Sequence, residues 1–280
     1  MKISISNIAW SPHNRIDIYN FLKKNNVKNI EIAPKLFLFD EKKLFFPKKK
    51  NLDNKLKELK KYNLKIISMQ SLLYNSQNCE LFTSVKKREN LFNHLKKIIK
   101  LAGKLKIPNL VFGSPKNRII PSKLNTDKAN LIAIKLFRKL GNYASKNKTT
   151  ISIESNPKIY GTNFLNNIYE TYNFVQKVNH KSVKMILDTG EILINQNLKE
   201  ISYIINLTKK FIHHVHISQP FLKPLNNTKM VNLVFKELQK INYNKYISIE
   251  MKNPGDNNIK IVKNSILRLI KIRKNYLKKL

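Results

Sequence analysis

The sequence predicts an α/β protein, a single (β/α)8 TIM barrel that spans residues 1–280. Short β-branched runs recur along the whole chain, and segments with apolar residues at helical spacing lie between them. Successive runs start about 25 to 45 residues apart, which is the interval of βα units in a barrel of about 250 residues. Because parallel strands need crossover connections, this alternation predicts a parallel sheet.

The predicted elements follow one another in a regular order. Strands are expected at 2–8, 27–32, 64–69, 109–112, 149–153, 183–187, 213–217 and 246–249. Between the third and fourth strands, Leu91, Leu95, Ile98 and Ile99 have the i, i+4, i+7, i+8 spacing of a helix face. Segments 124–145 and 259–280 follow the same pattern and are also predicted helices.

The chain is expected to form one domain, because no Gly-, Pro- or Ser-rich linker divides it. A doubly wound open sheet is the competing fold. The turn after the first predicted strand lacks the G-x-G-x-x-G sequence, and Gly103 and Gly113 are too far apart to replace it. The barrel is therefore the simpler interpretation.

The net charge of +37 first suggests a partner of negative charge, such as a nucleic acid. Only six of the 54 basic residues are arginine, the side chain that base and phosphate readers favour. The lysines occur mostly singly or in pairs along the chain, which is the distribution expected for solvent-exposed faces of helices. We therefore expect no specific nucleic-acid partner.

Other features predict a cytoplasmic protein without a membrane partner. No run approaches the roughly 18 apolar residues of a membrane span, and the first residues lack the apolar core of a signal peptide. A single cysteine, Cys79, excludes a disulfide framework and a thiolate zinc cluster. The sequence of the predicted helix surfaces does not decide whether the protein is a monomer, so a homo-oligomer remains an alternative.

Four polar residues end the last four predicted strands: Glu154, Asp188, His216 and Glu250. They are separated by 34, 28 and 34 residues, about one βα unit each. Barrels place their chemistry at the carboxyl ends of the strands, so these side chains are expected at one rim. One such acid is often a helix cap or an ion-pair partner, but three acids and a histidine in successive units indicate a site. Carboxylates with one imidazole suit a single divalent ion, with Mn²⁺ favoured and Mg²⁺, Co²⁺ or Zn²⁺ also suitable.

Three histidines lie in the seventh predicted strand. His214 and His216 face the same way, whereas His213 points to the other face. His216 lies nearest the strand end and is the better metal ligand. His214 is expected one layer deeper, where it supports a ligand by a hydrogen bond.

The whole chain from Ile3 onward resembles the xylose-isomerase-like superfamily of sugar isomerases and epimerases, particularly its ketose 3-epimerase and hydroxypyruvate isomerase branch. The resemblance includes the segments Met69-Gln-Ser-Leu72, Val111-Phe-Gly-Ser-Pro115 with Arg118 after it, and Glu154-Ser-Asn-Pro157 with Tyr160-Gly-Thr162. It implies that Glu154, Asp188, His216 and Glu250 bind one metal ion.

Two positions depart from the pattern of that branch. Glu191 stands where its members carry a histidine, and Gln219 stands where they usually carry an acid. Both positions tend to touch the substrate, so the departures bear on specificity and activity.

The chemistry expected from these residues is proton transfer on a small-molecule sugar. A metal that coordinates adjacent carbonyl and hydroxyl oxygens polarises the carbonyl and stabilises an enediolate. Glu154 and Glu250 would take a proton from one face and return one on the other, so both are predicted catalytic residues of an isomerase or epimerase. Arg118, Gln70 and Glu31 are further candidate substrate contacts.

An abasic-site endonuclease is the alternative function, because it shares this barrel and suits the positive charge. Its zinc cluster needs extra histidines after the third and fourth strands, where this chain has Gln70 and Gly113. It also needs a histidine soon after Asp188. We therefore favour the isomerase.

Overall fold

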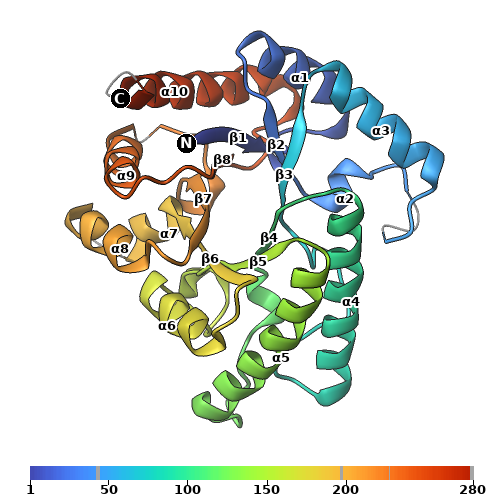
Figure 1. Cartoon of the computed structure of the whole chain (residues 1–280), viewed down its shortest axis with the longest axis vertical. Helices are drawn as coiled ribbons and strands as arrows, with labels where there is room; N and C mark the ends of the chain where they lie inside the picture. The colour runs from blue at the N-terminus through green and yellow to red at the C-terminus, as the bar shows by residue number, and fades with distance from the viewer. Residues whose placement is uncertain (42–44, 196–197, 227, 278–280) are drawn as a thin grey trace. The chain divides into compact units, whose positions relative to one another are not determined.

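The computed structural model describes residues 1–41, 45–195, 198–226 and 228–277. Eight strands follow one another in the order β1 to β8 in a closed barrel, and neighbouring strands pair in parallel. The strands are β1 (Lys2–Ser6), β2 (Asn29–Ile32), β3 (Lys65–Met69), β4 (Asn109–Phe112), β5 (Thr150–Ile153), β6 (Val183–Asp188), β7 (Ile212–Ser218) and β8 (Tyr246–Glu250) (Figure 1). The predicted fold class is confirmed.

Helices follow the strands along the chain. They are α1 (Arg15–Lys24), α2 (Pro34–Phe37), α3 (Lys49–Lys61), α4 (Val85–Lys104), α5 (Thr126–Lys146), α6 (Ile168–Val178), α7 (Thr189–Asn195), α8 (Ile201–Thr208), α9 (Thr228–Lys240) and α10 (Ile259–Leu277). The three helical segments predicted from the sequence coincide with α4, α5 and α10, although residues 278–280 lie outside the described part of the chain. None of the helices described is long and apolar enough to cross a membrane.

Local side-chain hydrogen bonds explain where several elements begin and end. The predicted first strand is two residues too long, because the Ser6 hydroxyl accepts a bond from the Ile8 amide and starts a short 3-10 helix there. Ser84 caps α4 by accepting from the Lys87 amide at 3.2 Å. Asn125 caps α5 in the same way, so this helix starts at Thr126.

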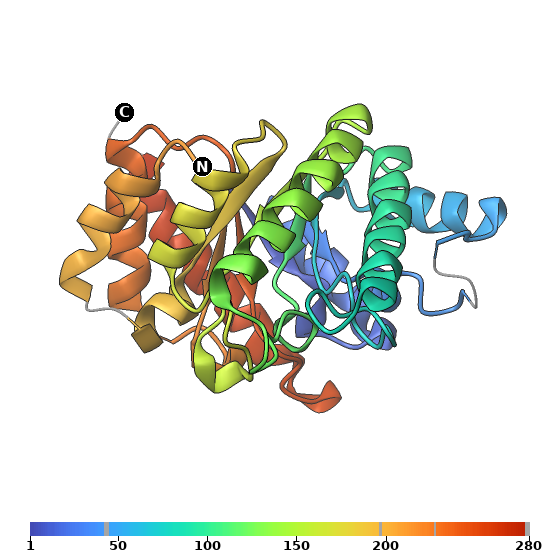
Figure 2. The ribbon, with the colours of Figure 1, turned by 90° about the horizontal axis from the view of Figure 1, so that it is seen from below.

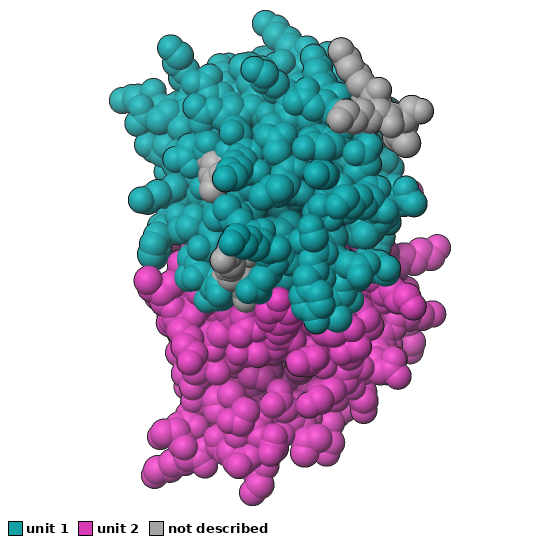
Figure 3. All heavy atoms as spheres, turned by 90° about the vertical axis from the view of Figure 1, so that its left-hand side faces the viewer, with its two compact units in different colours: residues 1–67, 188–209, 214–280 teal, residues 68–187, 210–213 magenta. Residues whose placement is uncertain are grey.

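Contacts within the chain group into two compact units (Figure 3). The first contains residues 1–67, 188–209 and 214–280, and the second contains residues 68–187 and 210–213. The first unit is therefore assembled from both ends of the chain. The expectation that residues 1–280 form one domain stays a prediction.

In the first unit, β8 lies between β1 and β7. It pairs with β1 from Lys2↔Tyr246 to Ile5↔Ile249, and with β7 from His214↔Tyr246 to Ser218↔Glu250. Helices α8, α9 and α10 pack against one another in turn, and α10 also contacts β1 and β8 (Figure 1). This packing brings the first strand of the chain against its last helix.

The strands of the first unit carry an unusual polar face. Isoleucine or valine alternates along β1, β7 and β8 with a polar residue, and side chains alternate between the two faces of a sheet. The polar set is Ser4, Ser6, His214, His216, Ser218, Ser248 and Glu250, all buried. The Ser4 and Ser248 hydroxyls join at 2.5 Å across the β1–β8 pair. The interior of such a barrel usually holds branched apolar side chains, so this face is built for a polar site.

In the second unit, α4, α5 and α6 pack side by side (Figures 1 and 2). Beneath them runs a series of edge-to-face aromatic contacts. Phe137 of α5 lies 5.0 Å from the ring of Phe112 in β4 and 5.7 Å from that of Phe174 in α6, between ring centroids. Phe164 continues the series to Phe82. These rings tie the helices to the sheet.

Replacing Phe137 by alanine should lower the free energy of unfolding by about 3–5 kcal/mol, because the side chain is fully buried and its removal leaves a cavity between two rings. Urea denaturation followed by circular dichroism measures this loss. Leu131→Ala on the same helix is the control, since Leu131 is 57% exposed. A loss for Phe137→Ala no larger than for Leu131→Ala would contradict the role of Phe137.

Candidate metal centre and active site

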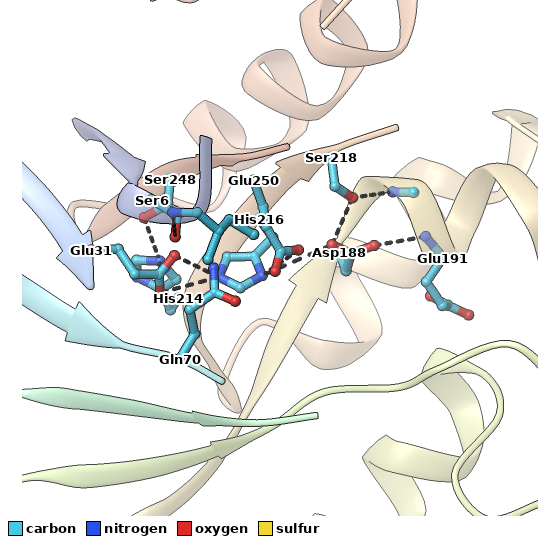
Figure 4. A network of polar contacts seen from close by, with 12 residues as sticks. Ser6, Glu31, Gln70, Asp188, Glu191, His214, His216, Ser218, Ser248 and Glu250 are labelled. Carbon is cyan, nitrogen blue, oxygen red and sulfur yellow. Dashed lines mark hydrogen bonds and ion pairs between the residues drawn. The ribbon is translucent and has the colours of Figure 1, made fainter. Parts of the chain in front are cut away.

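Three of the predicted ligands lie together at the carboxyl ends of β6, β7 and β8. Asp188, His216 and Glu250 each offer one ligand atom, and these atoms lie within 4.8 Å of one another. Nδ1 of His216 is 3.3 Å from a Glu250 oxygen and 4.0 Å from an Asp188 oxygen (Figure 4). His216 is fully buried and the two acids are nearly so. An imidazole nitrogen that faces two carboxylates is a donor set that fits a divalent metal ion.

Asp188 is held by bonds to both of its oxygens. Oδ1 accepts from the Glu191 amide at 2.7 Å and Oδ2 accepts from the Ser218 hydroxyl at 2.7 Å. The Gly190 amide donates in turn to the Ser218 oxygen, and a β-carbon at position 190 would lie only 2.5 Å from that oxygen. Glycine is therefore required there. Asp188 caps α7 and also faces His216. Its role as a helix cap therefore does not exclude a role as a metal ligand.

The other nitrogen of His216 contacts Glu31 of β2. Nε2 lies 3.1 Å from Oε2 and 3.2 Å from Oε1 of this carboxylate, which is fully buried (Figure 4). A carboxylate that accepts from Nε2–H fixes the tautomer and the ring orientation, and it leaves the Nδ1 lone pair for a metal ion. Glu31 is thus placed to orient His216.

His214 lies one layer deeper on the same face of β7. Its Nε2 is 2.8 Å from the Ser248 hydroxyl and 3.6 Å from Glu31. Glu31, His214 and His216 also offer ligand atoms within 4.8 Å of one another. The direct contact between Glu31 and Nε2 of His216 supports an orienting role for Glu31. Glu31 was expected to contact the substrate, and its contact with His216 was not predicted, although both residues are polar positions on strands of alternating pattern.

Glu191 and Gln219, the two residues that depart from the family pattern, contact Asp188 and Ser218 respectively. Glu191 is buried, its amide holds Asp188, and its side chain accepts from the Asn195 amide group at 3.0 Å. The Gln219 side chain is buried and donates to the Ser218 carbonyl at 3.3 Å. Their contact with a substrate stays a prediction.

Glu154, the remaining predicted ligand, belongs to the second unit and directly follows β5. Its amide donates to the Phe112 carbonyl at 3.0 Å, so the pairing with β4 continues to the end of the strand. A β-carbon at Gly113 would lie 2.5 Å from Oε2 of Glu154. The carboxylate therefore lies over the backbone that follows β4, a position that only glycine at 113 permits.

Two predicted substrate contacts also lie in the second unit. Gln70 follows β3, is buried, and accepts a bond from the Ser71 hydroxyl at 3.3 Å. Arg118 follows β4 after a 3-10 turn at Pro115–Asn117 and is fully buried. Burial lowers the pKa of the Arg118 guanidinium to about 10, although the negative charge of Glu154 opposes this shift. The side chain therefore stays cationic at neutral pH.

The comparison with protein families agrees with this fold. Residues 21–272 match the family described as xylose isomerase-like TIM barrel. The chain belongs to this family. The resemblance stated from the sequence motifs is thus confirmed at the level of the family. No curated protein matches the chain.

Solved structures of the same fold include several sugar epimerases. A 3-keto-D-glucoside 4-epimerase from E. coli matches with a TM-score of 0.77 at 16% identity, over 96% of this chain and 98% of that one. A D-psicose 3-epimerase from Clostridium cellulolyticum H10 gives 0.75 at 16%, over 99% of each chain. The IOLI protein with a bound zinc atom gives 0.68 at 15%, over 100% of this chain and 99% of that one. At these identities the likeness shows the fold alone.

Replacing Ser218 by alanine should weaken Mn²⁺ binding by about 10–100-fold, because the hydroxyl fixes one oxygen of Asp188. Calorimetric titration of the metal-free protein measures the affinity. Ser4→Ala is the matched control: it removes a buried serine hydroxyl from the same polar face, but one that contacts Ser248 rather than Asp188. Equal affinities for the two variants would show that Ser218 does not support the site.

Proposed function

We propose that the protein is a divalent-metal-dependent isomerase or epimerase that acts on a small-molecule sugar. The observation that carries the proposal is the convergence of the Asp188 and Glu250 carboxylates on Nδ1 of His216. Membership of the xylose isomerase-like family supports it, and so do the epimerases among the structures of the same fold. A cytoplasmic location stays a prediction from the sequence.

Glu154 is proposed as the fourth metal ligand. It directly follows Ile153, whose partner in β6 is Met185, and β6 ends three residues later at Asp188. In parallel strands the carboxyl ends meet at the same edge of the sheet, so both acids leave the sheet on one side. With Asp188, His216 and Glu250 this gives three carboxylates and one imidazole for a single ion, with Mn²⁺ favoured.

The proposed reaction is proton transfer next to a carbonyl. When bound, the metal supplies polarisation of the substrate carbonyl. Glu250 and Glu154 are the proposed acid and base. One, as the carboxylate, removes a proton from the carbon beside the carbonyl and leaves an enediolate; the other, as the carboxylic acid, gives a proton to the enediolate. Return on the opposite face inverts that carbon, and return at the neighbouring carbon shifts the carbonyl.

The first test needs no knowledge of the product. Purified protein should contain about one equivalent of divalent metal, and incubation with a panel of ketoses in D₂O should place deuterium beside the carbonyl of at least one of them. Mass spectrometry of the metal content and proton NMR of the sugar measure the two results. Removal of the metal with a chelator should abolish the exchange. Exchange that persists without metal would contradict the proposal.

Glu154→Gln and Glu250→Gln should each lower turnover by at least about 10²–10⁴-fold, since glutamine keeps an oxygen but cannot act as a base. Asp188→Asn and His216→Ala should act through metal affinity, so excess Mn²⁺ should partly restore their activity but not that of the glutamine variants. Glu237→Gln is the control, because Glu237 pairs with Lys240 on the outer helix α9. Near-normal turnover in both glutamine variants would rule out the two-base reaction.

The positive charge provides the test of the alternative, an abasic-site endonuclease. We expect weak binding to DNA without sequence preference, falling steeply with salt, because lysines spread along the chain attract phosphates without reading bases. Fluorescence anisotropy with intact and abasic duplexes at several salt concentrations measures it. Tight binding selective for the abasic duplex at physiological salt would favour the nuclease.

A further inference from the structure

Arg118 is a buried cation whose charged end has no hydrogen-bond partner in the described part of the chain. Its exposed fraction is 0%, and Nε, Nη1 and Nη2 make no hydrogen bond to any described residue. Even Arg138, which is exposed to solvent, donates to the carbonyls of Lys177 and Val178. Three unpaired donor nitrogens on one buried side chain are rare, because buried polar groups almost always have partners.

Leaving a guanidinium in this state is strongly unfavourable, since a charge taken out of water needs both an opposite charge and hydrogen bonds. The acids whose charges act on Arg118 are Glu154 and Glu170. Glu170 is already engaged, because one oxygen accepts from the Asn166 amide and the other from the Asn167 side chain at the start of α6. Glu154 is the proposed metal ligand. Neither carboxylate satisfies the guanidinium.

We propose that Arg118 binds an oxyanion of the substrate, so that the sugar carries a phosphate or a carboxylate group. The planar guanidinium presents donors in a fork that matches two oxygens of either anion. The inference that the anion belongs to a sugar rests on the proposed function, whereas the anion site itself rests on Arg118 alone.

The place of Arg118 in the second unit supports this assignment. Strands β4 and β5 pair through Phe112↔Ile153, and Arg118 and Glu154 both follow the carboxyl ends of these adjacent strands. Gly113 begins the loop that leads to Arg118, and the same glycine lies beneath the Glu154 carboxylate. The cation and the proposed base thus follow two adjacent strand ends, and Gly113 connects β4 to the loop of Arg118 while lying against Glu154. A substrate that reaches Glu154 would have its anionic group within reach of this loop.

The test measures the anion site without using turnover. Thermal unfolding of the metal-loaded protein is followed with inorganic phosphate, with acetate and with chloride at equal ionic strength. We expect phosphate or acetate to raise the midpoint by several degrees above chloride, since a ligand that binds only the folded state stabilises it. The anion with the larger effect identifies the group. In Arg118→Met this increase should disappear.

Two further variants make the result decisive. Lys116→Gln removes one positive charge from the exposed part of the same loop and should keep the increase, which separates the site from general attraction to the basic surface. Arg118→Lys keeps the charge without the fork and should keep less of the increase than the wild type; it also replaces Arg118→Met if that variant does not fold. Equal anion effects in the wild type and in the Arg118 variants would overturn the proposal.

Binding of sugars then tests the link to the proposed function. Calorimetry compares D-fructose 6-phosphate, D-glucuronate and D-fructose, and we expect at least one anionic sugar to bind about 10-fold or more tightly than fructose, with Arg118→Met removing the preference. Deuterium exchange is measured with the same sugars. An anion effect that depends on Arg118 without any exchange would leave the anion site standing and count against the isomerase. Deuterium exchange with neutral ketoses and no anion effect would support the isomerase and overturn the anion site.

Discussion

The fully buried contact between Glu31 and His216 is the interaction on which the candidate site depends. A carboxylate without access to water needs a hydrogen-bonded partner, and the imidazole of His216 provides it at 3.1 Å. The same contact directs the other ring nitrogen toward Asp188 and Glu250. One pair of side chains therefore satisfies a buried charge and sets the direction of the donor atom that a metal ion would use.

Asp188 shows how one residue joins the fold to the site. As the last residue of β6 it accepts the Glu191 amide and so starts α7, and its second oxygen accepts the Ser218 hydroxyl from β7. The helix start, the strand end and the carboxylate are fixed by the same bonds. A change that disturbs the cap would also move the carboxylate, so the beginning of α7 and the site cannot vary independently.

The sequence was sufficient for the fold and for placing three candidate ligands together, because both follow from a regular repeat. Strand runs and helical spacing placed every strand within a few residues, and the ends of the last four strands marked the polar side chains of the candidate site. The sequence was not sufficient for the contact of Glu31 with His216, since that contact depends on which strands face one another with their polar sides. The burial of Arg118 also escaped it. That burial follows from the path of a loop in which Ser114 takes a left-handed conformation (φ 44°), which the sequence does not reveal.

The polar face of the first unit also bears on how the chain folds. The hydroxyl pair Ser4–Ser248 joins residues 244 positions apart, and the contact of Glu31 with His216 joins residues 185 apart. Such contacts have a high entropic cost of loop closure and cannot form until β7 or β8 has been synthesised. Until then, the serines and Glu31 near the N-terminus remain hydrated, whereas apolar side chains in their place would stay exposed and prone to aggregate. The polar residues near the pairing of the first and last strands thus protect the N-terminal part of the chain from aggregation until the C-terminal strands have been synthesised.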